Sequence, residues 1–305
     1  MKGKHIKTNY SGRLRKTPGK LKSFLAERVP SAPIPQKIFD LAAVRSSYAS
    51  IGAEPDYSTE TSDHRVVKGY ETVQFGAGSG GGYLLRALGL AELVHNLIDP
   101  KEVEVKHTIG ARTIYTEREI GMLKVDAARY LIERDFPGTK VNPLPYDVAE
   151  IPDHTLKNLL SRVLLAIIAI DDPEQILRIN DLGYGLTEII QVACHRKAES
   201  GHVAISIPHV TACLRCTLDI SEDRQIRRLD SESASSIDIM TISHLGAKVA
   251  LELMIAKATG RPIQQWDSTK NLLYIANTRQ TLSPNGPKLT WEETHKRKNC
   301  PICNG

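Results

Sequence analysis

A glycine-rich turn is the stretch of this sequence that points most directly to chemistry. Residues 73–82 contain the pattern G-x-G-x-x-G at Gly76, Gly78 and Gly81, with Gly80 inside it. In such a turn the first glycine permits a tight bend, and the second lets the backbone approach a phosphate. The third lets a helix pack close to the preceding strand, so that helix N–H groups face the anion. The spacing predicts a phosphate-binding turn.

An acidic residue follows this turn at a spacing that suits a nucleotide. Asp99 lies 23 residues after Gly76, at the end of the next apolar segment. In nucleotide-binding folds an acid at this place bonds a ribose hydroxyl. The glycine pattern alone also occurs in ordinary turns, but the pattern followed by this acid predicts a nucleotide site. A nicotinamide-dependent oxidoreductase would share both features.

Three charged residues favour ATP over a nicotinamide cofactor. Arg112 and Lys124 follow the second expected strand, and their charges suit a triphosphate. Asp172 follows the most apolar segment of the chain, and a carboxylate at that edge of a sheet can hold the Mg²⁺ that accompanies ATP. Each alone could be a surface charge, but all three are expected at one edge of one sheet.

The cysteines form a second constellation. Two C-x-x-C pairs are present, Cys213–Cys216 and Cys300–Cys303. In a chain without an export signal such pairs predict a four-thiolate zinc site before they predict disulfides. Cys194 stands apart and is followed by basic residues, which could lower the pKa of its thiol. We favour a buried cysteine without a function for Cys194.

The elements that must position these residues alternate between strand and helix. Strands are expected at 72–75, 92–99 and 141–146, with helices through 83–88 and over 121–134. The continuous apolar run 163–170 is typical of a central parallel strand buried on both faces, and a helix follows it. Further strands are expected at 189–193, 202–207 and 272–276, and a helix at 242–258. This order predicts an α/β fold, a Rossmann-like mixed sheet flanked by helices.

Charge and composition define the rest of the chain. The net charge is +5, but residues 1–30 carry nine Lys or Arg and one acid, so the remainder is slightly acidic. We therefore divide the chain into a basic extension over residues 1–60 and a nucleotide-binding domain with the zinc site over 61–305. A solvated extension is favoured over one that binds nucleic acid. No apolar run is long enough to span a membrane and none resembles a signal peptide, so we expect a cytoplasmic protein without a membrane partner.

Taken in order, these segments resemble the ThiF/MoeB/HesA family of ubiquitin-activating-like adenylyltransferases. The resemblance runs from about Glu71 to Cys303. It rests on an ordered set of segments: the nucleotide loop 75–81, the bridge 88–93, the lysine motif 120–125, the aspartate segment 169–172 with Arg178 after it, and the approach to the zinc at 201–216 with the closing pair 300–303.

The resemblance implies an activity and its cofactors. It implies ATP-dependent adenylation of the C-terminal carboxylate of a ubiquitin-like protein or peptide that ends in glycine, with release of pyrophosphate. Lys124 and Arg112 would contact the ATP phosphates, Asp172 rather than Asp171 would bind Mg²⁺, and the four paired cysteines would hold Zn²⁺. The acyl group could then pass to a sulfur donor, a conjugating enzyme, a nucleophile on the substrate or Cys194. The resemblance also implies a homodimer, with Arg45 or Arg65 near the nucleotide of the partner subunit.

The sequence departs from the family pattern in three places. Lys101 stands where the family has a second acid, so Asp99 is left as the candidate ribose ligand. The asparagine that usually precedes the phosphate arginine is absent before Arg112. No cysteine lies between the two pairs, where thioester-forming members place one, and Ser231–Ser236 is expected to be a mobile loop. These departures leave open a catalytically inactive scaffold, and the oxidoreductase remains a further alternative.

Overall fold

An eight-stranded mixed sheet organises the chain. The computed structural model describes residues 64–218, 234–263, 265–277 and 287–303, which belong to a unit spanning Thr59–Gly305. The expected extension over residues 1–60 lies outside the described residues, as do residues 231–233 of the serine-rich segment. The strand order is β3-β2-β1-β4-β5-β6-β7-β8. The strands span Glu71–Phe75 (β1), Val94–Ile98 (β2), Lys140–Leu144 (β3), Leu165–Ile168 (β4), Glu188–His195 (β5), Ser200–Ser206 (β6), Leu272–Ala276 (β7) and Lys288–Glu292 (β8).

The two halves of the sheet differ in strand direction. Neighbouring strands from β3 to β5 run parallel, whereas β6, β7 and β8 pair antiparallel with their neighbours. The chain enters at β1, builds outward to β3 and then crosses back to β4 on the other side of β1. The order therefore reverses between β1 and β4. In open α/β sheets, ligands bind in the crevice outside the carboxyl ends of the strands at such a point.

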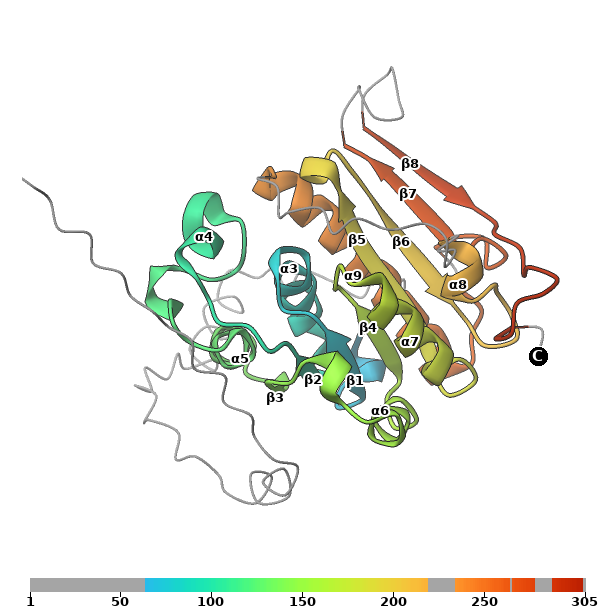
Figure 1. Cartoon of the computed structure of the whole chain (residues 1–305), viewed down its shortest axis with the longest axis horizontal. Helices are drawn as coiled ribbons and strands as arrows, with labels where there is room; N and C mark the ends of the chain where they lie inside the picture. Colours follow the sequence, from blue (N-terminus) through green and yellow to red (C-terminus); the bar gives the residue numbers. More distant parts are fainter. Residues whose placement is uncertain (1–63, 219–233, 264, 278–286, 304–305) are drawn as a thin grey trace, which may run out of the picture. The chain divides into compact units, whose positions relative to one another are not determined.

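Helices cover both faces of the sheet (Figure 1). One apolar cluster joins the sheet to α3, α5 and α9, and a second joins its other face to α6, α7 and α8. The helices span Ser79–Leu88 (α3), Val105–Thr108 (α4), Lys124–Asp135 (α5), Asp153–Leu160 (α6), Pro173–Gly183 (α7), Leu214–Thr217 (α8) and Ser236–Thr259 (α9). This arrangement confirms the predicted α/β fold.

The longest helix, α9, is apolar and long enough by composition to cross a membrane. It is also a core helix, because Ile242, Ala250 and Leu253 are among its many buried residues. A core helix of a soluble protein passes the same test of length and hydropathy.

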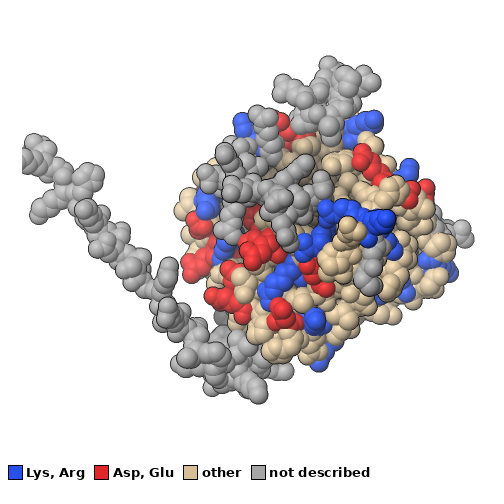
Figure 2. Space-filling model, turned by 45° about the vertical axis from the view of Figure 1, so that its right-hand side comes forward, with Lys and Arg blue, Asp and Glu red and all other residues tan. Residues whose placement is uncertain are grey.

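Charged side chains of both signs adjoin one another on the face drawn in Figure 2.

The structure contains elements that the sequence pattern did not indicate. The helix α6 and the edge strand β8 are both short: α6 buries only Leu156 and Leu160, and no residue of β8 is fully buried. The apolar run 163–170 is longer than β4, since it continues into the loop after the strand. The expected helices and the other strands lie where predicted, with shifts at their ends.

Candidate functional site

The glycine turn between β1 and α3 uses its three glycines for three different reasons. Gly76 has φ +100°, and a Cβ there would lie 2.4 Å from the carbonyl oxygen of Ala169. A Cβ at Gly81 would lie 2.3 Å from the carbonyl oxygen of Gly76, so α3 packs against the turn itself. A Cβ at Gly78 would meet nothing within 4 Å. Gly76 and Gly81 are thus required by the fold, whereas Gly78 leaves open space in which a ligand could approach the backbone.

A buried glutamine beneath the turn supports it. The side-chain nitrogen of Gln74 donates hydrogen bonds to the carbonyl oxygens of Gly76 and Gly81, both at 2.9 Å. Gln74 is fully buried in β1. No motif in the sequence indicated Gln74, although a polar residue within an apolar strand is a signal of such a contact.

Asp99, after β2, contacts the same turn. Its carboxylate accepts one hydrogen bond from the backbone N–H of Ala77 at 2.8 Å and another from that of Lys101 at 2.9 Å. Asp99 is buried. The acid that the spacing placed at the site therefore lies at the glycine turn and helps to fix its conformation.

Tyr115 connects the turn to the expected phosphate lysine. Its hydroxyl lies 2.8 Å from the carbonyl oxygen of Ala77 and 3.2 Å from that of Lys124. Burial raises the pKa of Tyr115 well above its usual value, and the Asp99 charge raises it further, so the hydroxyl keeps its proton. No sequence pattern indicated Tyr115, because the contact joins residues that only the fold brings together.

Two of the expected cations lie around one histidine. Lys124 begins α5 and is buried, and burial lowers the pKa of its ammonium while Asp99 raises it. Arg112 ends the short 3-10 helix Ile109–Ala111 and is half-buried. The pKa of His107 is lowered first by burial, then by Lys124 and, more weakly, by Arg112. Glu104 acts on His107 in the opposite direction, so the segment between β2 and α5 brings several cations together with one acid.

Asp172 lies at the carboxyl end of β4, across the reversal point from β1. Its Oδ1 caps α7 by accepting the backbone N–H groups of Glu174 at 3.1 Å and Gln175 at 3.4 Å. Asp171 is exposed beside it. Arg178, six residues further on in α7, donates to Asp153 and to the carbonyl oxygen of Val148, and so anchors α7 to the segment before it.

The four paired cysteines converge at the other end of the domain. Their sulfur atoms all lie within 4.8 Å of one another, and the Cys213–Cys300 and Cys216–Cys303 sulfur pairs are 3.6 Å apart. These distances are too long for disulfides. Four thiolates bound to zinc at about 2.3 Å in a tetrahedron lie roughly 3.8 Å apart, so the cluster fits that ion. The backbone N–H of Arg297 donates to the sulfur of Cys216, as a supporting contact of a metal thiolate would.

Comparison with known proteins decides the family. The ThiF family profile matches residues 63–302, most of the chain. The chain belongs to the ThiF family. A search of curated protein sequences finds no match.

Solved structures show the same fold. E. coli MccB with ATP superposes with a TM-score of 0.61 at 14% identity, over 79% of this chain and 68% of that one. E. coli MccB with MccA-N7isoASN gives a TM-score of 0.61 at 14% identity, over 79% and 69%. PaaA gives a TM-score of 0.55 at 17% identity, over 75% and 74%. At these identities the likeness shows the fold alone.

In this ThiF-family chain Cys194 lies apart from the four paired cysteines. Cys194 is exposed by its total surface, but its thiol turns toward α3, since a Cβ at Gly80 would lie 3.9 Å from the sulfur. Burial of the thiol raises its pKa to about 12. The basic residues that follow Cys194 in the sequence therefore do not lower this pKa, and the raised value agrees with the favoured interpretation of a buried cysteine without a function. Cys194 is therefore a poor nucleophile at neutral pH.

Proposed function

We propose that this ThiF-family protein uses ATP to adenylate the C-terminal carboxylate of a ubiquitin-like protein or peptide that ends in glycine. The observation that carries the proposal is the open backbone at Gly78, with the cation of Lys124 beside Asp99, whose carboxylate holds the turn, and with Arg112 in the same segment as Lys124. A nicotinamide cofactor would need the turn but has no triphosphate for these cations to neutralise. E. coli MccB, which shares the fold, has been crystallised with ATP and with MccA.

The reaction needs orientation and charge neutralisation more than covalent chemistry by the protein. A carboxylate oxygen of the substrate attacks the α-phosphorus of ATP, the bond to the β-phosphate oxygen breaks, and pyrophosphate leaves with the electron pair. Lys124 and Arg112 stabilise the negative charge that develops on the phosphate oxygens, and Asp99 holds the turn that receives them. We assign the ribose contact to Asp99 as well.

Two metal ions fit the residues present. The carboxylate of Asp172 offers the oxygen ligand that Mg²⁺ prefers, at the edge of the sheet where the phosphates would lie. When bound there, Mg²⁺ would neutralise phosphate charge. Zinc in the cysteine cluster would be structural, since all four positions are filled by the protein and no position remains for a substrate.

Partners and assembly belong to the same proposal. We propose a cytoplasmic homodimer in which Arg65, in the short 3-10 helix His64–Val67, lies near the nucleotide of the partner subunit. Arg45, the other candidate, lies outside the described residues. The acceptor of the acyl group would be a conjugating enzyme, a sulfur donor or another nucleophile.

Pyrophosphate release tests the activity. The protein is mixed with ATP, Mg²⁺ and a library of short synthetic peptides that carry every C-terminal residue as a free carboxylate. The matched control is the same library with C-terminal amides, which cannot be adenylated. We expect release with the acids only, and most with C-terminal glycine. No release with either library or with ubiquitin-like proteins would support an inactive scaffold, and calorimetric binding of NAD but not of ATP–Mg²⁺ would support an oxidoreductase.

A further inference from the structure

Three polar side chains on β5 and β6, Gln191, His195 and His202, form a hydrogen-bonded triad that is separate from the residues already described. His195 Nε2 lies 2.7 Å from His202 Nδ1, and the two rings meet edge to face. The other ring nitrogen of His202 contacts the side-chain oxygen of Gln191. Neither the adenylation step nor the zinc cluster uses these residues, and two of them carry titratable rings.

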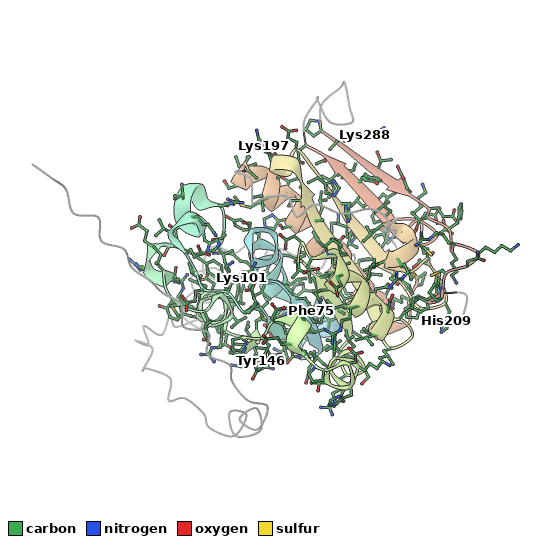
Figure 3. The ribbon with its side chains drawn as sticks, viewed as in Figure 1. Phe75, Lys101, Tyr146, Lys197, His209 and Lys288 are labelled. Carbon is green, nitrogen blue, oxygen red and sulfur yellow. The ribbon has the colours of Figure 1, made fainter. Side chains whose placement is uncertain are left out.

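The triad lies at the edge of the sheet where the nucleotide site is expected. Gln191 pairs with Ile168, the last residue of β4, and β5 continues four residues further to His195. That extension reaches roughly 13 Å past the end of β4. Figure 3 shows Lys197, just after β5, at the opposite end of these strands from His209, which follows β6. His195 therefore projects past the carboxyl end of β4, as does Asp172.

The three side chains also share the face of the sheet that Asp172 borders. Side chains alternate between faces along a strand. Val203 packs in the cluster with α3 and α9, whereas Ala204 packs in the cluster with α6 and α7, so His202 points to the α7 side. Asp172 caps α7 on this same side. Tyr274 of β7 is the strand partner of His202 and borders the triad on the side away from Gln191.

The hydrogen bonds set the protonation pattern of the two rings. Burial, with a smaller contribution from His195, lowers the pKa of His202 to about 3, so His202 is neutral and has one N–H. That N–H must donate to the Gln191 oxygen, which only accepts. His202 Nδ1 then accepts from His195 Nε2. Burial also lowers the pKa of His195, so this ring is neutral too, and its Nδ1 is the nitrogen without a proton.

We propose that His195 Nδ1 is the general base of a second step, in which an amine accepts the acyl group from the acyl-adenylate. The amine nitrogen attacks the acyl carbon and a C–N bond forms. The bond from that carbon to the phosphate oxygen breaks, AMP leaves with the electron pair, and the amine proton passes to His195 Nδ1. His202 and Gln191 are positioning residues that fix the tautomer of His195. This inference rests on the proposed adenylation.

The positions of the cysteines favour an acceptor that comes from outside the protein. Four of the five hold the expected zinc, and the thiol of Cys194 faces α3, on the other side of the sheet from His195. The chain thus offers no reactive thiol of its own beside this base. A neutral imidazole suits an amine, which must lose a proton as it attacks.

Substitutions can separate the two steps. ATP–pyrophosphate exchange with the free-acid peptide library reads adenylation, and AMP formation with glycinamide as the amine reads transfer. His195→Gln keeps a nitrogen near the Nε2 position and removes the base. We expect exchange near the wild-type rate, transfer lowered about 100-fold, and accumulation of bound acyl-adenylate. The matched control is His154→Gln, an exposed histidine on α6, which should change neither rate.

The positioning residues have their own test. Gln191→Leu removes the oxygen that orients His202 and should lower the rate constant of transfer without changing the KM for peptide. Gln191→Glu restores an acceptor oxygen and should restore transfer. Transfer by His195→Gln at the wild-type rate, or no transfer to glycinamide by a wild-type protein that catalyses exchange, would overturn this inference. Absence of exchange in the wild type would instead overturn the proposed function.

Discussion

The carboxylate of Asp99 accepts the backbone N–H of Ala77 at 2.8 Å and thereby joins the end of β2 to the glycine turn after β1. The same carboxylate accepts the N–H of Lys101. One buried acid therefore fixes both the turn that would receive phosphates and the loop that leads to Lys124. Its position next to the turn follows from the parallel pairing of β1 with β2.

Asp99→Asn tests this double contact. An asparagine has one acceptor oxygen where aspartate has two, so one backbone N–H loses its partner and faces an amide group. We expect a loss of about 1–3 kcal/mol in the free energy of unfolding, measured with urea, and weaker ATP binding by calorimetry. The exposed Glu117→Gln serves as the control. Unchanged stability would show that the two hydrogen bonds contribute little.

Two glycine substitutions separate folding from nucleotide binding. Gly78→Ala adds a methyl group that meets nothing within 4 Å, so the fold should tolerate it, while ATP affinity should fall because the methyl group blocks the approach of phosphate. Gly76→Ala places a Cβ 2.4 Å from a backbone oxygen at positive φ and should destabilise the domain. Thermal unfolding and ATP titration of both variants check this. Full ATP affinity in Gly78→Ala would place the phosphates elsewhere.

The charged residues of the site should affect adenylation without unfolding the protein. Asp172→Asn keeps a side chain that can cap α7 and removes the metal-binding charge. Lys124→Met keeps the buried chain length and removes the cation. Each should slow ATP–pyrophosphate exchange about 100-fold or more. The controls are Asp147→Asn, a cap of the 3-10 helix Val148–Glu150, and the exposed Lys140→Met. Near-normal exchange in both site variants would contradict the adenylation mechanism.

The cysteine cluster predicts one zinc ion per chain. Metal analysis of the purified protein should find it, and a strong chelator should lower the thermal unfolding temperature, since the ion joins α8 to the C-terminal segment. Cys300→Ser should lose zinc and stability, whereas Cys194→Ser should lose neither. Less than half an equivalent of zinc in the wild type would refute the assignment.

A buried histidine predicts how stability depends on pH. Burial lowers the pKa of His95, which hydrogen-bonds Thr72, to about 4. A histidine in the unfolded chain has a pKa of about 6.5, so below that pH the unfolded state takes up a proton that the folded state excludes. The contribution of His95 is complete above this pH and is lost as the pH falls toward its folded pKa, on the order of 3 kcal/mol in all. Urea unfolding at neutral and acidic pH should show a smaller pH dependence for His95→Asn than for wild type or His154→Asn.

The sequence determined the features that depend on local spacing. The strand, turn and helix around Gly76 follow from glycines that alone tolerate the bend and the close packing, and the cysteine cluster follows from the two C-x-x-C pairs. The apolar run 163–170 indicated a central strand because burial on both faces excludes polar residues. These patterns also carried the resemblance to the ThiF family.

Only the tertiary structure decided the contacts between residues far apart in the chain. Gln74 and Tyr115 support the turn through hydrogen bonds to backbone oxygens, and no spacing in the sequence encodes which oxygen a side chain reaches. The sequence left the pKa of Cys194 open, because basic residues follow it in the chain, whereas desolvation depends on what packs around the sulfur. The hydrogen-bonded triad of Gln191, His202 and His195 exists only because β5 and β6 pair in one register, which places His202 between two residues of the neighbouring strand.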